Sequence, residues 1–146
     1  EKTLPGGTRR VRFLPAMPRE EFMNLLAAAG VILDPLHFGG GHTSYEALAV
    51  GTPVVTLPGE FLRSRITQAL YRKMNFTDLI VSTPQQYIET AVRLGTDRSE
   101  RDRVSATILE LCPILFDDLQ EVRGVETWLW SLASGGPFGE RGMSIP

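Results

Sequence analysis

Two short apolar runs limit the folds open to this chain more than any other feature. They occupy residues 31–35 (VILDP) and 53–58 (PVVTLP), and neither alternates apolar with polar residues as a half-exposed strand would. Between them lie a glycine-rich stretch and a helix of about two turns, expected at residues 44–50. Strands buried on both faces and joined through a helix are typical of a parallel sheet. The sequence therefore predicts an α/β fold.

The rest of the chain continues the same pattern. Further strands are expected at 11–15 and 78–82, and further helices at 18–30, 62–74, 83–95, 99–111 and 118–132. This order predicts a Rossmann-like parallel sheet with helices on both faces. Four strands are fewer than the roughly six of a complete doubly wound domain, and the sequence does not begin with methionine. We therefore expect residues 11–132 to be the second half of a Rossmann-like domain, after a truncated lead-in (1–10) and before a flexible tail (133–146).

Composition argues against several functional classes. The formal net charge is −2 and no basic run occurs, which argues against nucleic acid as a partner. No apolar run approaches the ~20 residues of a membrane span. The lone cysteine, Cys112, cannot form an internal disulfide, so a reducing, cytoplasmic location is expected. We expect Cys112 to be inert at an apolar helix end.

The glycine-rich stretch is the first candidate site, because ligands bind such sheets at the carboxyl ends of the strands. Its members are Gly39, Gly40, Gly41, His42, Thr43 and Ser44. Glycines permit close backbone approach, and the start of the following helix offers free N–H groups and a positive dipole end. The stretch matches neither the Walker A loop nor the GxGxxG fingerprint. A diphosphate seat and a purely structural turn therefore both remain open.

Several charged residues near this loop also have two interpretations. Thr43 and Glu46 fit a capping box, and the alternative is that Glu46 accepts ribose hydroxyls. Asp34 follows a strand and is either catalytic or a loop anchor. Arg63 and Arg65 lie near an expected helix start, where cations are unfavourable, so we expect an ion pair or an external anion.

Three other residues bear on the kind of site. Phe22 either packs in the core or stacks on a nucleobase. The two histidines, His37 and His42, have no evident nucleophile partner and are too few for a convincing metal site. We therefore expect neither a metal ion nor a cofactor.

The ordered motifs resemble a known family. The stretches FLPAMPREEF, DPLHFGGGHTSYEALAVGTPVVTLPGEFLRSR, ALYRKM and YIETAVRLGTD look like the carboxyl-terminal, donor-binding part of the O-linked N-acetylglucosamine transferase and SPINDLY glycosyltransferases, over residues 10–132. The pattern EAxAxGxP (46–53) recurs more widely in glycosyltransferases of the GT-B architecture. The resemblance implies a partial C-terminal GT-B domain that uses a UDP- or GDP-sugar donor for inverting transfer to protein side chains.

The resemblance also implies roles for individual residues. Residues 42–44 would contact the diphosphate and Glu46 the ribose, although animal members carry an aspartate at slightly different spacing. The backbone near Met17, together with Arg19, would line the nucleobase pocket. Phe22 stands where animal members have a base-stacking histidine, so stacking remains open.

The remaining implications concern parts outside this chain. The family's catalytic groups, including a lysine that neutralises the leaving group, would lie upstream, as would the amino-terminal GT-B domain and any tetratricopeptide repeats. We therefore expect the chain alone not to catalyse transfer. The alternatives are a non-catalytic nucleotide-binding or scaffold module, which would lack the upstream lysine, and a GT-B nucleotide-sugar epimerase, which would release free sugar.

Overall fold

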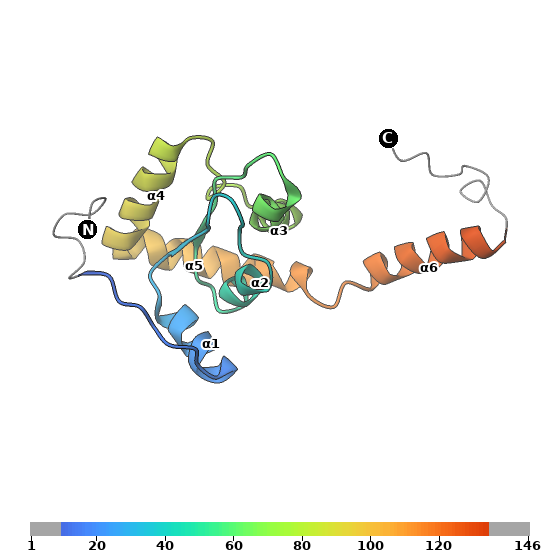
Figure 1. Cartoon of the computed structure of the whole chain (residues 1–146), viewed down its shortest axis with the longest axis horizontal. Helices are drawn as coiled ribbons and strands as arrows, with labels where there is room; N and C mark the ends of the chain where they lie inside the picture. Colours follow the sequence, from blue (N-terminus) through green and yellow to red (C-terminus); the bar gives the residue numbers. More distant parts are fainter. Residues whose placement is uncertain (1–9, 135–146) are drawn as a thin grey trace.

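The computed structural model describes residues 10–134, so the predicted lead-in and tail lie almost entirely outside it. Two short parallel strands, separated by a helix, lie in the first half of the described residues, and helical elements follow them (Figure 1). The elements are α1 (Arg19–Ala28), β1 (Ile32–Leu33), α2 (His42–Ala49), β2 (Val54–Val55), η2 (Leu62–Ser64), α3 (Ile66–Lys73), α4 (Pro84–Thr96), α5 (Arg98–Leu111), η3 (Cys112–Leu115) and α6 (Leu119–Ala133); η2 and η3 are 3₁₀ helices.

The sheet is smaller than the sequence predicts. β1 and β2 pair in parallel, with Ile32 opposite Val54, and a single parallel bridge from Thr56 to Ile80 takes the place of the strand expected at 78–82. Along the rest of that edge, the Tyr71 hydroxyl accepts a hydrogen bond from the Val54 N–H (2.9 Å) and donates one to the Val54 carbonyl (3.0 Å). A side chain of α3 therefore satisfies the backbone groups that a longer third strand would have paired.

The prediction of a strand at 11–15 is also wrong, because within the described residues the segment has no strand to pair with. No pairing strand lies beside this segment in the described part of the chain, and Phe13 is 93% exposed. An apolar run becomes a strand only where its backbone groups find partners, and here they find none.

The core forms where the helices meet β2. α2 contacts β2, α5 and η3, while α4 contacts both β2 and α5. The fully buried side chains at its centre are Leu48, Val54, Val55, Tyr71, Leu79, Leu94, Val104 and Ile108. This packing holds the carboxyl end of β1, and the loop that follows it, on a rigid base.

Local signals decide where the helices begin. The Thr83 hydroxyl accepts a hydrogen bond from the Gln86 N–H and Pro84 opens α4, which confirms that helix start. The helix predicted at 62–74 is instead divided into η2 and α3. Ser64 explains the break, because its Oγ accepts from the Gly59 N–H and donates to the Phe61 carbonyl, which holds residues 59–64 as a turn.

The two end helices have few neighbours. α1 buries only Leu26, because α2 is its principal contact. α6 extends away from the rest of the molecule and buries no residue (Figure 1).

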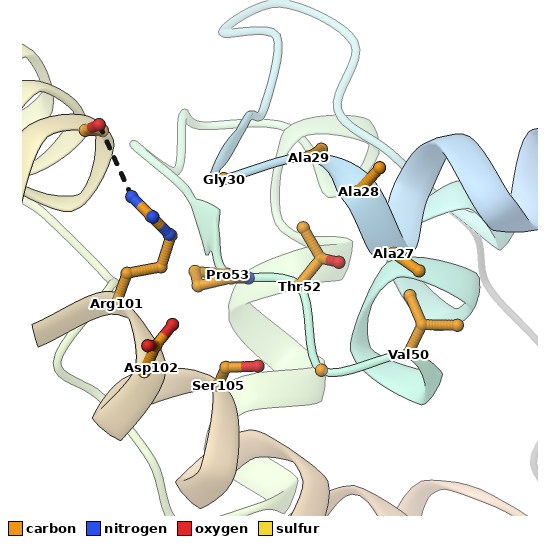
Figure 2. A pocket seen from close by; sticks show the side chains of 12 residues that line it. Ala27, Ala28, Ala29, Gly30, Val50, Thr52, Pro53, Arg101, Asp102 and Ser105 are labelled. Atoms are coloured by element: carbon orange, nitrogen blue, oxygen red, sulfur yellow. Dashed lines mark hydrogen bonds between the residues drawn. The ribbon is translucent and has the colours of Figure 1, made fainter. Parts of the chain in front are cut away.

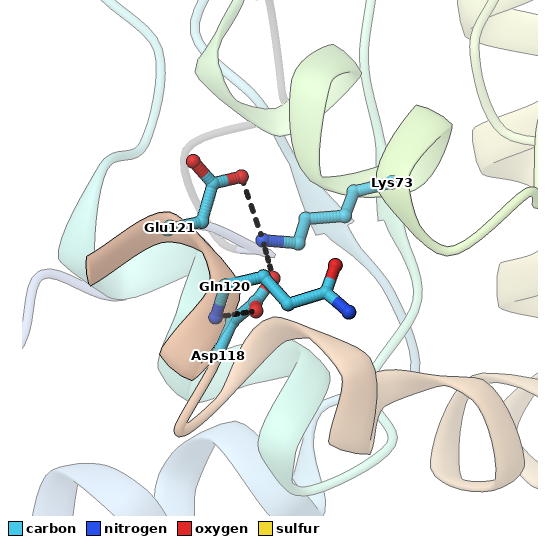
Figure 3. Close-up of polar contacts among 4 residues, drawn as sticks. All are labelled: Lys73, Asp118, Gln120 and Glu121. Atoms are coloured by element: carbon cyan, nitrogen blue, oxygen red, sulfur yellow. Dashed lines mark hydrogen bonds and ion pairs between the residues drawn. The ribbon is translucent and has the colours of Figure 1, made fainter. Parts of the chain in front are cut away.

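A small ion-pair cluster joins α6 to α3. Lys73 Nζ lies 2.8 Å from Asp118 Oδ2 and 3.4 Å from Glu121 Oε1 (Figure 3). Asp118 also caps α6 by accepting from the Gln120 N–H. Its hydrogen bond to Lys73 lowers the pKa of Asp118 and raises that of Lys73. The cluster therefore ties the first turn of α6 to the end of α3.

Candidate functional site

Asp34 anchors the loop that follows β1. Its side chain is buried, with Oδ1 accepting from the Gly40 N–H and Oδ2 accepting from the Thr56 hydroxyl, both at 2.7 Å. Its backbone is fixed as well, since the Asp34 N–H donates to the Val55 carbonyl and the Asp34 carbonyl accepts from the Tyr87 hydroxyl. Of the two interpretations of Asp34, these contacts favour the loop anchor.

Packing inside the protein explains two of the three glycines. A Cβ atom at Gly39 would lie 2.9 Å from Asp34 Oδ1, and one at Gly40 would collide with Ser44 Oγ. At Gly41 the nearest atom would be Ile66 Cδ1 at 3.8 Å, which is ordinary contact. Gly39 and Gly40 are therefore required by the fold of the loop itself, whatever the loop binds.

The free hydrogen-bond donors of the loop lie at the start of α2. This helix begins at His42, two residues earlier than predicted, with Gly41 as its N-cap. Within the described residues, the N–H groups of Gly41, His42 and Thr43 have no hydrogen-bond partner. Ser44 differs, because its N–H donates to the Gly41 carbonyl and its buried Oγ lies 2.8 Å from Thr67 Oγ1. Residues 41–43 therefore supply the available donors, whereas the polar groups of Ser44 are used internally.

The predicted capping box is wrong, and Glu46 does something else. No side chain caps α2. Because the helix begins at His42, Thr43 is already helical and cannot act as its N-cap. Glu46 Oε1 instead accepts from Arg19 Nε at 3.1 Å and lies 3.3 Å from His42 Nε2.

Arg19, His42 and Glu46 therefore meet at one place. The Glu46 side chain is only 10% exposed, whereas those of Arg19 and His42 are 75% and 80% exposed. Glu46 Oε2 has no hydrogen-bond partner among the described residues and is not fully buried. The cluster presents two exposed basic side chains and one unpartnered carboxylate oxygen beside the open N–H groups of α2.

The two other predicted residues lie at the same end of α1. Met17 precedes the helix and is half-buried. Phe22 is also half-buried, and its N–H donates to the Pro18 carbonyl. Phe22 stands one helical turn after Arg19, on the same face. The structure therefore groups Met17, Arg19 and Phe22 without placing Phe22 in the core.

Arg63 supports the loop from its far side. The Arg63 carbonyl accepts from the Gly39 N–H at 2.8 Å, and Arg63 Nε donates to the His37 carbonyl at 3.1 Å. Its guanidinium lies 4.5 Å from the centre of the Phe61 ring. Within residues 10–134 neither Arg63 nor Arg65 forms an ion pair.

The supporting residues Thr56, Thr67 and Tyr87 were not predicted. They contact the loop and the start of α2 from 22 to 53 residues away in sequence. No local sequence motif predicts such long-range contacts, so they are found only in the tertiary structure.

A pocket lies at the other end of the sheet, where the two strands begin. It is bounded by the ends of α1 and α2 and by one side of α5, with Pro53, Arg101 and Ser105 in its wall (Figure 2). Arg101 Nη1 donates to the Leu94 carbonyl at 2.9 Å, near the end of α4. The one strongly basic group in this pocket is therefore engaged in capping a helix.

Three further observations bear on function. The described residues contain no cluster of three or more potential metal ligands. None of the described helices combines the length and apolarity needed to cross a bilayer. Cys112 is buried, and burial raises the pKa of its thiol, which disfavours the reactive thiolate.

The fold and the site together define a class. A parallel β-α-β unit with its donor-rich loop at the carboxyl ends of the strands is typical of Rossmann-like ligand-binding domains. Residues 2–117 match the model of glycosyl transferase family 41, and the chain belongs to that family.

Named relatives agree with this assignment. The chain is 32% identical, over 82% of its length, to a UDP-N-acetylglucosamine–peptide N-acetylglucosaminyltransferase of Caenorhabditis elegans, and 24% identical to a probable SPINDLY enzyme of Solanum lycopersicum. It is 25% identical, over 66% of its length, to a UDP-glucose:protein N-β-glucosyltransferase of Actinobacillus pleuropneumoniae. The chain spans only 11%, 11% and 16% of these three proteins.

A solved structure supports the same conclusion. A mutant O-GlcNAc transferase of Thermobaculum terrenum superimposes with a TM-score of 0.74 at 31% identity, over 84% of this chain and 24% of its own. The predicted family and fold class, part of a Rossmann-like domain of a GT-B glycosyltransferase, are thus confirmed.

Proposed function

We propose that this chain binds the nucleotide-sugar donor, a UDP- or GDP-sugar, of a protein glycosyltransferase. The observation that carries the proposal is the cluster of Arg19, His42 and Glu46 beside the unpartnered N–H groups of residues 41–43. Membership of glycosyl transferase family 41 supports it.

The proposed chemistry follows from the donors and acceptors available. The N–H groups of Gly41, His42 and Thr43 and the positive end of α2 would hold the diphosphate. The exposed nitrogens of Arg19 and His42 would add donors, so that charge developing on the leaving diphosphate is stabilised by groups already in place. In this proposal the donor is held without a metal ion or cofactor.

The ribose and the base would lie on either side of this cluster. Glu46 Oε2 is free to accept a ribose hydroxyl, while Oε1 keeps Arg19 and His42 in position. The base would lie against the start of α1, near Met17, Arg19 and Phe22. A half-buried aromatic ring is suited to stacking on a base.

The transfer itself would need parts beyond this chain. We propose that an upstream amino-terminal GT-B domain, with or without tetratricopeptide repeats, supplies the catalytic groups, binds a protein acceptor and works in the cytoplasm. The names of the relatives, which specify peptide and protein acceptors, support a protein acceptor here. We expect inverting transfer by the assembled enzyme and none by this chain alone.

Amide chemical shifts test the donor site directly. Titration of the ¹⁵N-labelled chain with UDP, and separately with GDP, should perturb the amide signals of residues 41–43. His42→Ala should weaken the response, while His37→Ala, which removes the other exposed histidine side chain, should not. Saturable shifts located elsewhere, or equal effects of the two variants, would contradict the proposed site.

A further inference from the structure

Asp34 is a buried carboxylate whose charge no basic side chain offsets. The residue is 3% exposed, and within residues 10–134 it forms no ion pair. Burial of an ionised carboxylate is unfavourable unless strong hydrogen bonds replace water. Asp34 has two short ones, from the Gly40 N–H and from the Thr56 hydroxyl. The fold therefore keeps the Asp34 carboxyl group buried at the base of the loop although its burial is energetically unfavourable.

The position of Asp34 links every element around the loop. Its N–H is bonded to β2 and its carbonyl to Tyr87 of α4, while its carboxylate reaches up to Gly40. Gly39 fits only because it has no Cβ atom to meet this carboxylate. The loop is thus wrapped directly over the Asp34 side chain.

Arg63 completes the restraint. Its carbonyl accepts a hydrogen bond from the N–H of Gly39. With the N–H groups of Gly39 and Gly40 both occupied, the N–H groups of residues 41–43 are the next ones along the chain, and these remain open. The hydrogen bonds of Gly39 and Gly40 therefore fix the chain just before α2 begins.

We propose that Asp34 is a positioning residue for the donor loop, acting as a hydrogen-bond acceptor that presets residues 39–41 for the diphosphate. It does not act as a base, nucleophile or cation ligand, because both of its oxygens are occupied within the protein. This role rests on the proposed donor site above, and goes beyond it by naming what preorganises that site.

Two substitutions separate the hydrogen bonds of Asp34 from its charge. In Asp34→Asn, the amide oxygen can still accept from Gly40 and the amide nitrogen can donate to the Thr56 hydroxyl. In Asp34→Ala both bonds disappear. Thr56→Val removes only the second bond and leaves the one to Gly40.

Calorimetric titration with UDP and GDP, with circular dichroism to verify folding, tests the proposal. Asp34→Ala should weaken nucleotide binding roughly tenfold or more, because the Gly40 N–H would lose the acceptor that holds it in place. Asp34→Asn should bind within about threefold of the original chain or more tightly, since removing a negative charge does not weaken attraction for a diphosphate. Thr56→Val should change affinity by no more than about threefold, because the bond to Gly40 remains.

A loss of binding of roughly tenfold or more in a folded Asp34→Asn variant would overturn the proposal, because the charge would then be the property that matters. This result is decisive even if Asp34→Ala does not fold, since Asp34→Asn retains both hydrogen bonds.

A measurement without nucleotide separates this role from the donor proposal. Hydrogen exchange of the Gly40 amide, which donates to Asp34, should be roughly tenfold or more faster in Asp34→Ala than in Asp34→Asn. Equal exchange in the two variants would refute the positioning role even if nucleotides bind. Failure of the original chain to bind either nucleotide would refute the donor proposal, while the exchange result would still decide whether Asp34 sets the loop.

Discussion

Replacement of Glu46 by glutamine separates the contribution of the Arg19–His42–Glu46 cluster to binding from its contribution to stability. Glutamine has nearly the same size and keeps one oxygen, but it loses the charge that holds Arg19 and His42. Their side chains are 75% and 80% exposed, and exposed ion pairs contribute about 0–1 kcal/mol. Glu46→Gln should therefore lower the free energy of unfolding by less than about 1 kcal/mol, a shift in melting temperature of at most ~4 °C.

The effect on nucleotide binding should be much larger. A hydrogen bond to a charged group contributes about 1.5–3 kcal/mol, so loss of the carboxylate proposed to bind the ribose should weaken UDP or GDP binding roughly ten- to hundredfold. Calorimetry and thermal melts on the same samples give both quantities. Glu121→Gln is the matched control, because it removes a carboxylate paired with Lys73 far from the loop.

The proposed role of Glu46 in nucleotide binding is contradicted if Glu46→Gln binds nucleotide as tightly as the original chain. It is also contradicted if the variant unfolds several degrees lower than Glu121→Gln, because Glu46 would then be mainly structural.

Three further predictions concern the framework of the site. Tyr71→Phe should lower the free energy of unfolding, measured by urea denaturation, by about 2–4 kcal/mol, because it leaves the buried N–H and carbonyl of Val54 unpaired. A decrease below about 0.5 kcal/mol would show that the Tyr71 hydroxyl is not needed to pair these two groups. Burial raises the pKa of Tyr71 above its ordinary value, so its contribution to stability is present at neutral pH and is lost as the pH rises above about 10. Unfolding free energies measured from pH 8 upward should therefore fall more steeply for the original chain than for Tyr71→Phe, and parallel curves would contradict this. Gly40→Ala should lower the free energy of unfolding by about 1–3 kcal/mol, because its Cβ would displace Ser44 from Thr67. Gly95→Ala, which has open space around it, should instead stabilise α4 by up to about 1 kcal/mol. Equal effects of the two variants in thermal melts would show that close packing around Gly40 does not matter.

Local signals predicted those parts of the fold in which the deciding contacts are themselves local. Thr83 and Pro84 mark the start of α4 because the capping hydrogen bond spans only three residues. The strand at 78–82 was overestimated because Tyr71, a residue of α3, takes over the pairing of Val54. The break between η2 and α3 depends on the hydrogen bonds of Ser64, which helical periodicity does not encode.

The same division holds for the site. The glycine-rich loop and the donors at the start of α2 follow from the sequence, because residue type and order suffice to predict them. The choice between the interpretations of Glu46 depended on Arg19, 27 residues away, and on α2 beginning at His42. Asp34 could not be assigned either, since its partner Thr56 comes from another part of the chain. Sequence predicts where the candidate site lies, whereas tertiary contacts determine which atoms remain free to bind a ligand.

The central claim is that this chain holds a nucleotide-sugar donor at the start of α2. Calorimetric titration of the folded chain with UDP and with GDP, repeated on His42→Ala, tests it most directly. We predict saturable one-to-one binding of one nucleotide in preference to the other, weakened in His42→Ala without loss of folding. A chain that is folded by circular dichroism and binds neither nucleotide would contradict the account and leave the loop as a structural turn.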